Sequence, residues 1–366
     1  MALLVYAAEC LVSLVSIGLS VIASRSIYKG APHGNDGHCK NNLPRHPKTL
    51  VIMPCKGIDI RFDETLEAVK KQSYTECELV AVVDSESDPA YSVLARHGIK
   101  TIISDPELIK TTSCSGKNRA VMTALSLHSE AFELFVVVDS DTTVGTEWLG
   151  ALIMPLAADD RVGVSTTFPL FYPLGGFWSM TKTVWGLVGS SMQNDRRTRF
   201  VWGGSMAFRS KLVKTALVEL SRSTADDIAI GKACKELGMD IVSVPRARPI
   251  VYVKETFGTF SEWSVRQTAL SILGNRRLFK YGVAYYALFC VNDFALLYAA
   301  YAHSILAVLF AIPILLNILG FCLATGFYNP IYYLIVAFMP IVYLVDLVLG
   351  RLKKNIRWRG ADYKLA

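Results

Sequence analysis

The sequence lacks the patterns that mark a zinc module or a P-loop. Its eight cysteines are scattered, with no Cys-x-x-Cys pair and no histidine at zinc-ligand spacing. Gly116-Lys117-Asn118 joins a glycine to a lysine, but the Gly-x4-Gly-Lys-Ser/Thr spacing is absent. We therefore interpret the cysteines as reduced thiols without a chemical role.

Charged residues are scarce as well. They make up 19% of the 366 residues, whereas hydrophobic residues make up 52%, which is too apolar for an ordinary soluble enzyme. The sequence has no internal repeat and no low-complexity tract. This composition predicts one soluble domain, over residues 48–258, together with membrane segments at both ends.

The N-terminal apolar segment, Leu3–Ala23, is about as long as a bilayer-spanning helix. No basic residue precedes it, which argues against a cleaved signal peptide and for a retained anchor over residues 1–25. Residues 26–47 are predicted to be a linker. Basic residues follow the anchor, so the next domain is expected on the cytoplasmic face; they are Arg25, Lys29, Lys40, Arg45 and Lys48.

The C-terminal third contains three further apolar stretches, Val283–Ala302, His303–Phe321 and Pro330–Leu349, followed by a basic tail over residues 351–366. An interfacial helix is predicted over 259–282. If domain and tail are both cytoplasmic, the chain between them crosses the membrane an even number of times. Asp293 makes the first stretch the weakest span, so we expect it at the interface or packed against the other two.

Segments typical of strands and helices alternate through the middle of the chain. This alternation predicts an α/β fold, with a mostly parallel sheet covered by helices on both faces. The expected strands are 49–53, 79–83, 100–103, 134–138, 162–166 and 240–244, and the expected helices are 63–72, 88–97, 116–127, 146–156 and 226–237. The net charge of +7 is attributed to membrane-surface contacts and not to nucleic acid.

The most informative stretch is the apolar run 134–138, which ends in Asp139-Ser140-Asp141. The carboxyl ends of strands are where open α/β sheets bind ligands. Two carboxylates at this spacing can hold one Mg²⁺ or Mn²⁺ ion and leave positions for phosphate oxygens. Asp139 and Asp141 are therefore candidate metal ligands at a diphosphate site, although a bare Asp-x-Asp is more often a solvated turn.

Two other acidic sites occur at strand ends or helix starts. Asp84 and Asp88 follow the second strand, where a carboxylate can contact a nucleoside; Asp88 before Pro89 is equally well a helix N-cap. Asp226-Asp227 begins a predicted helix, where capping is the usual role. A buried carboxylate there can also serve as a general base, because an adjacent like charge raises one pKa.

Two non-acidic elements complete the candidate site. Gly203-Gly204 lets backbone N–H groups approach a ligand closely, or else forms a tight turn before a strand. Lys117 offers a cation to a diphosphate. The segment Phe171–Met192, with Trp178 and Trp185, is either interfacial or a buried core helix.

The order and spacing of these motifs along the chain resemble those of family 2-type inverting glycosyltransferases with the GT-A fold. The motifs are Pro54-x-Lys56-Gly57, Asp84–Ala90, Gly116-Lys117-Asn118, Asp139-Ser140-Asp141, Gly203-Gly204-Ser205 and Asp226-Asp227. Lys56-Gly57, Asp88-Pro89-Ala90 and the terminal Trp358–Tyr363 are most similar to the ceramide glucosyltransferase branch, which belongs to the family 2/21 type.

The resemblance implies a hexosyltransferase that moves a sugar, with glucose expected, from a UDP-sugar to a lipid hydroxyl. It also implies a Mg²⁺ or Mn²⁺ cofactor at Asp139 and Asp141, and Asp227 as the catalytic base. The expected partners are the nucleotide sugar, a lipid acceptor and the membrane; no feature indicates an oligomeric state. The implied donor-binding residues are Asp84, Asp88, Lys56, Lys117, Asp139, Gly204, Asp226 and Arg266.

One family motif, Gln/Arg-x-x-Arg-Trp, is incomplete. Arg266 or Gln267 can stand for its first residue, but the Arg-Trp pair is absent. Arg276-Arg277 would lie about three turns later on a continuous helix. Arg357 and Arg359 are alternative diphosphate contacts, or else contacts to lipid headgroups. A polyprenyl-phosphate glycosyltransferase, a processive polysaccharide synthase and an inactive membrane scaffold remain as alternative functions.

Overall fold

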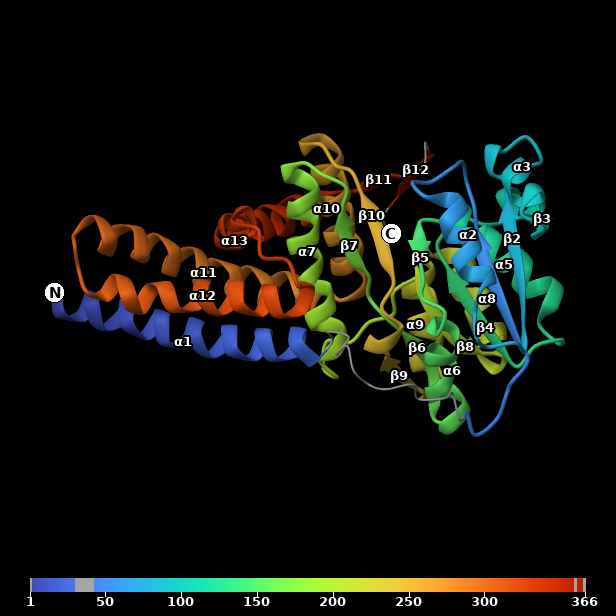
Figure 1. The fold of residues 1–366 in the computed structure, drawn as a ribbon, viewed down its shortest axis with the longest axis horizontal. Coiled ribbons are helices and arrows are strands. Elements are labelled where there is room, and N and C mark those ends of the chain that lie inside the picture. The colour runs from blue at the N-terminus through green and yellow to red at the C-terminus, as the bar shows by residue number, and fades with distance from the viewer. Residues whose placement is uncertain (1, 30–42, 359–360, 365–366) are drawn as a thin grey trace.

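The computed structural model describes residues 2–29, 43–358 and 361–364, but not the side chains of 2–9, 26–29, 357–358 and 361. Most of the predicted linker and Arg359 thus lie outside the described residues, as does the side chain of Arg357. Figure 1 shows an α/β domain joined at one end to a group of long helices.

The central sheet has seven strands in the order β3-β2-β1-β4-β8-β6-β9. Four neighbouring strands are parallel, and β8 pairs antiparallel with both β4 and β6. The mostly parallel α/β sheet is therefore confirmed. The strands are β1 (Thr49–Pro54), β2 (Cys77–Val83), β3 (Lys100–Ile103), β4 (Leu134–Val138), β6 (Val162–Thr166), β8 (Ser205–Arg209) and β9 (Asp240–Ser243).

Helices cover both faces of this sheet because its central strands are apolar on both sides. In β1, Val51 and Met53 face one hydrophobic cluster, whereas Leu50 and Ile52 face the other. The first cluster includes residues of α2 (Phe62–Lys70), α3 (Pro89–Arg96) and α6 (Trp148–Ala158). The second includes residues of α5 (Gly116–His128), α8 (Val213–Arg222) and α9 (Asp226–Glu236).

A second, three-stranded sheet has the order β5-β10-β7 and was not predicted from the sequence. Its strands are β5 (Thr142–Thr143), β7 (Leu170–Pro173) and β10 (Ile250–Val253). β5 follows Asp141 directly, so this sheet begins at the acidic motif. A short helix, α4 (Glu107–Thr111), leads towards α5.

Three long helices run side by side at one end of the molecule (Figure 1): α1 (Ala2–Lys29), α11 (Arg277–Tyr301) and α12 (Leu306–Thr325). Side chains on α1 donate hydrogen bonds to the backbone of α12. Ser13 Oγ, for example, donates to the Leu309 carbonyl at 3.1 Å. Asn292 of α11 donates from Nδ2 to the Phe310 carbonyl at 3.0 Å, which satisfies part of a buried amide.

The helix α13 (Pro330–Leu352) runs in a different direction from α11 and α12 and contacts both of them (Figure 1). It packs against α7 (Phe177–Asn194) and α10 (Phe257–Gly274), so these helices form the junction with the α/β domain. Most of α7 is buried, which matches the core-helix interpretation of 171–192. By length and composition, α11, α12 and α13 could each cross a membrane.

The stretch 283–302, expected at the interface or packed against the other two apolar stretches, packs against both α12 and α13. One detail differs from the expectations for this region. The helix over 257–274 ends before Arg276, and α11 begins at Arg277, where Asn275 Oδ1 accepts from the Arg277 N–H at 3.1 Å. The assumption of one continuous helix through Arg276-Arg277 was wrong.

Candidate active site

One large cavity, of about 1590 Å³, connects the carboxyl ends of the central strands with the long helices. Its polar end includes Lys56, Asp84, Lys117, Asp139, Asp141 and Asp227. Its other end includes Leu19 and Ile22 of α1 and Phe289 of α11. Most of the predicted site residues therefore lie on one cavity, together with Gly204, Asp226 and Arg266.

Lys117 joins two of the predicted acidic sites. Its Nζ lies 2.6 Å from Asp139 Oδ1 and 3.0 Å from Asp226 Oδ2. Lys117 extends from the start of α5, Asp139 follows β4, and Asp226 begins α9. Burial acts to lower the pKa of Lys117, but the two carboxylates outweigh it and raise that pKa, so the lysine stays charged.

Asp227 and its neighbour Asp226 have environments suited to holding a proton. Burial, followed by the negative charge of Asp226, raises the pKa of Asp227 to about 7. Burial also raises the pKa of Asp226, against the opposing effect of Lys117. Asp227 Oδ1 accepts from the Ile228 N–H at 2.7 Å. A carboxyl group with a pKa near neutrality can act as a general base.

Asp84 and Asp88, the two candidates for contact with a nucleoside, have different surroundings in the structure. Asp84 lines the cavity, and its Oδ2 lies 3.1 Å from Lys56 Nζ. Asp88 caps α3, with Oδ1 accepting from the Ala90 N–H and from the Gly57 N–H, both at 2.9 Å. Asp88 therefore fixes the loop after β1, while Asp84 lies on the cavity wall.

Asp139 and Asp141 both lie at the polar end of the cavity, beyond β4. Within the described ranges, no group of three or more His, Cys, Asp or Glu side chains could hold a metal ion. Two carboxylates beside an open cavity nevertheless fit an ion such as Mg²⁺ or Mn²⁺, whose remaining ligands are typically phosphate oxygens and water. The donor set thus fits a metal bound together with a nucleotide.

The paired glycines allow close packing at the centre of the site. A Cβ atom on Gly203 would lie 2.5 Å from Asp226 Oδ1, and one on Gly204 would lie 2.3 Å from the Trp202 ring. The Gly204 carbonyl also accepts from the Asp139 N–H at 3.2 Å. These glycines therefore hold the acidic residues and Trp202 in place, in addition to lining the cavity.

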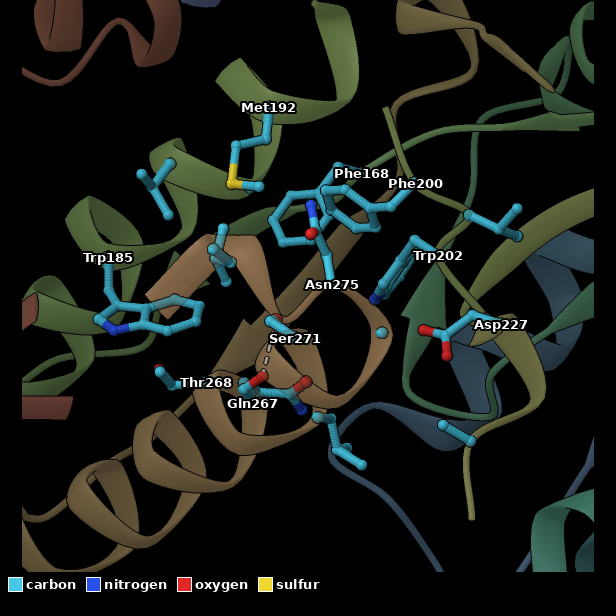
Figure 2. Close-up of a pocket in the computed structure, with 18 of the residues that line it drawn as sticks. Phe168, Trp185, Met192, Phe200, Trp202, Asp227, Gln267, Thr268, Ser271 and Asn275 are labelled. Atoms are coloured by element: carbon cyan, nitrogen blue, oxygen red, sulfur yellow. Dashed lines mark hydrogen bonds between the residues drawn. The ribbon is translucent and has the colours of Figure 1, made fainter. Parts of the chain in front are cut away.

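The middle of the cavity is walled by aromatic residues and by α10. Figure 2 shows the Asp227 carboxylate beside Trp202, with Phe168 and Phe200 nearby and Gln267 on the α10 side. Arg266 lines the same cavity, and so do Arg276 and Arg277 beyond the helix break. Both arginines therefore line the cavity after a helix break, and not about three turns along one continuous helix.

Lys182 is a site residue that the sequence reasoning missed. It is buried on α7 and lines the cavity, with Nζ 2.6 Å from Glu255 Oε1 and 4.2 Å from the centre of the Trp263 ring. Burial lowers its pKa, with Glu255 acting in the opposite direction. A single lysine inside the apolar segment 171–192 was the signal that could have revealed it.

The strand order and the cavity have the GT-A arrangement, and with the family match they identify a nucleotide-sugar glycosyltransferase. The chain belongs to glycosyl transferase family 21, whose family model matches residues 8–366. No curated relative matches the sequence.

The fold is shared with a solved structure. A mannosyltransferase from Pyrobaculum calidifontis, solved with GDP-Man and Mn²⁺, matches with a TM-score of 0.57 at 16% identity, covering 94% of this chain and 99% of that one. Glucosyl-3-phosphoglycerate synthase from Mycobacterium tuberculosis, solved with Mn²⁺ and UDP-glucose, is a more distant match. Its TM-score is 0.41 at 13% identity, covering 62% of this chain and 79% of that one.

Proposed function

We propose that this protein transfers a hexose, with glucose expected, from a UDP-sugar to the hydroxyl group of a membrane lipid of the ceramide type. The observation that carries this proposal is the single cavity that leads from Asp227 to α1 and α11. A water-soluble acceptor needs no such path. A lipid can place its chains against Leu19, Ile22 and Phe289 while its hydroxyl group reaches Asp227.

The donor would bind at the polar end of the cavity. Asp84 and Lys56 would contact the nucleoside, and Asp139 and Asp141 would hold Mg²⁺ or Mn²⁺ together with the diphosphate. When bound, such an ion stabilises negative charge on the leaving diphosphate. Arg266, Arg276 and Arg277 line the same cavity and can offset further negative charge there, in place of the missing Arg-Trp pair.

Asp227 would take the proton from the acceptor hydroxyl as its oxygen attacks the anomeric carbon of the sugar. The bond from that carbon to the nucleoside diphosphate breaks as the new glycosidic bond forms. A single displacement inverts the configuration at the anomeric carbon and needs no covalent enzyme intermediate. Lys117 keeps Asp226 and Asp139 in place beside the base.

The helices suggest an integral membrane protein whose catalytic domain lies on the cytoplasmic face. We propose that α1, α11 and α12 cross the bilayer and that α13 lies along its surface with α7 and α10. The domain and the basic tail would then be on the same side, with two crossings between them, as the charge distribution predicts. Lys353 and Lys354 directly follow α13 and would face lipid headgroups.

A transfer assay tests the proposal. Purified full-length protein is given a panel of labelled nucleotide sugars, Mg²⁺ or Mn²⁺, and extracted lipids, and the products are separated by chromatography. We expect a glycolipid whose formation is lost in Asp227→Asn while that variant still binds the donor. Asp141→Ala should instead lose metal-dependent donor binding.

The outcomes separate the alternatives. Full activity in Asp227→Asn would refute the assignment of the base, and donor binding in Asp141→Ala equal to that of the wild type would refute the metal site. Product only on phosphate-bearing carriers would identify a polyprenyl-phosphate glycosyltransferase. Donor binding without any product would favour an inactive scaffold.

A further inference from the structure

The last described residues form a hairpin that returns from the helical part to the catalytic domain. Strand β11 (Asn355–Trp358) begins shortly after α13 ends at Leu352, and it pairs antiparallel with β12 (Ala361–Lys364). Figure 1 shows the hairpin beyond α13, towards β10 and α2. The hairpin thus lies beside the α/β domain and not among the long helices.

One face of this hairpin points into the site. Ile356 and Tyr363 are directly paired across the two strands, so their side chains lie on the same face. Ile356 is only 3% exposed, and Tyr363 is partly buried. Both line the cavity that also includes Lys56 and Lys117.

Tyr363 makes one specific contact with the catalytic domain. Its hydroxyl oxygen accepts a hydrogen bond from the Gly116 N–H at 3.3 Å. Gly116 is the first residue of α5, whose backbone N–H has no partner within the helix. A phenol both accepts and donates, and among the described residues none accepts the Tyr363 proton. Among those residues, the Tyr363 O–H thus has no acceptor, and its oxygen lies at the residue that precedes Lys117.

We propose that the C-terminal hairpin forms one wall of the nucleotide subsite, with Tyr363 donating a hydrogen bond to an oxygen of the bound nucleotide. The Gly116 contact holds the phenol in place, and Ile356 with the Tyr363 ring provides an apolar surface against the nucleoside. This inference rests on the proposed function, because it requires that the cavity binds a nucleotide-sugar donor. It adds a binding residue that lies outside the α/β domain.

Direct binding measurements on the full-length protein test this inference. Uridine diphosphate and guanosine diphosphate are the probes, titrated by calorimetry in the presence of Mn²⁺. In Tyr363→Phe, which keeps the ring, we expect the dissociation constant to rise about fivefold to tenfold through loss of one hydrogen bond. In the transfer assay, the donor KM should rise by a similar factor with little change in kcat.

The matched control is Asp362→Asn. Asp362 is exposed and adjacent to Tyr363 on the same strand, so its side chain points to the opposite face. We expect wild-type nucleotide binding in this variant. Tyr363→Ala should bind more weakly than Tyr363→Phe because it also removes the ring.

The other possible results would contradict either this inference or the proposed function. Unchanged or tighter binding in Tyr363→Phe would overturn the inference while leaving the proposed function intact. Equal weakening in Asp362→Asn would also overturn it, because the effect would then come from the hairpin as a whole and not from the phenol. If the wild-type protein bound neither diphosphate, the proposed function would fail and this inference with it.

Discussion

At the scale of single residues, Lys117 is the contact that organises the site. It lies between Asp139 and Asp226, so a proposed metal ligand and the neighbour of the proposed base share one buried cation. A lysine with two carboxylate partners remains charged even though it is buried. The charge of Asp226 is therefore partly offset, but enough remains to act on the adjacent Asp227.

This arrangement predicts how activity depends on pH. Because the folded protein raises the pKa of Asp227 to about 7, its carboxylate form, which a base requires, is lost as the pH falls through that value. We expect kcat/KM to rise with pH up to about 7 and then level off. In Asp226→Asn the neighbouring charge is absent, so the rise should occur at lower pH. A pH profile identical to that of the wild type would contradict the assignment.

Gly204 allows a second prediction at this scale. Alanine at this position would place Cβ 2.3 Å from the Trp202 ring, so the ring must move into the cavity. We expect Gly204→Ala to lower transfer at least tenfold and stability by about 1–3 kcal/mol. Activity assays and thermal unfolding would measure both effects. Gly145→Ala is the control, because a Cβ there meets nothing within 4 Å.

At the scale of elements, the sequence predicted the strands that carry the acidic residues. β4 was recognised because an uninterrupted apolar run precedes Asp139, and β2 because a similar run precedes Asp84. A strand after Gly203-Gly204 was only one of two alternatives, because the antiparallel place of β8 between β4 and β6 depends on partners distant in the chain. Hydropathy likewise indicates the length and composition of α13, whereas its direction depends on packing against α7 and α10.

The contact between α1 and α12 can be tested directly. A Cβ on Gly320 would lie 2.6 Å from Ser24 Oγ and 3.3 Å from the Ser24 Cα atom, so the helices would have to separate. We expect Gly320→Ala to lower the unfolding temperature of the detergent-solubilised protein by several degrees. Gly18→Ala on α1, where a Cβ meets nothing within 4 Å, should leave it unchanged.

At the scale of the whole molecule, the helical part forms a wall of the cavity, in addition to its proposed role as a membrane anchor. Leu19 of α1 lines this cavity, whereas Leu11 of the same helix is largely exposed and does not line it. The proposed lipid path predicts that a bulkier side chain at Leu19 obstructs the acceptor chains and leaves the donor end untouched. Nucleotide binding and lipid transfer should therefore respond differently.

The variant Leu19→Trp separates these two effects. We expect this variant to bind nucleoside diphosphate as the wild type does. Transfer to a long-chain acceptor should fall several-fold more than transfer to a short-chain analogue. The reason is that the added indole narrows only the end of the cavity that lies far from Asp227. Leu11→Trp adds the same indole to the same helix away from the cavity, and both acceptors should react normally there. If Leu19→Trp lowered transfer to both acceptors equally, the acceptor chains would not run along α1, and the cavity would have to receive the lipid from another side.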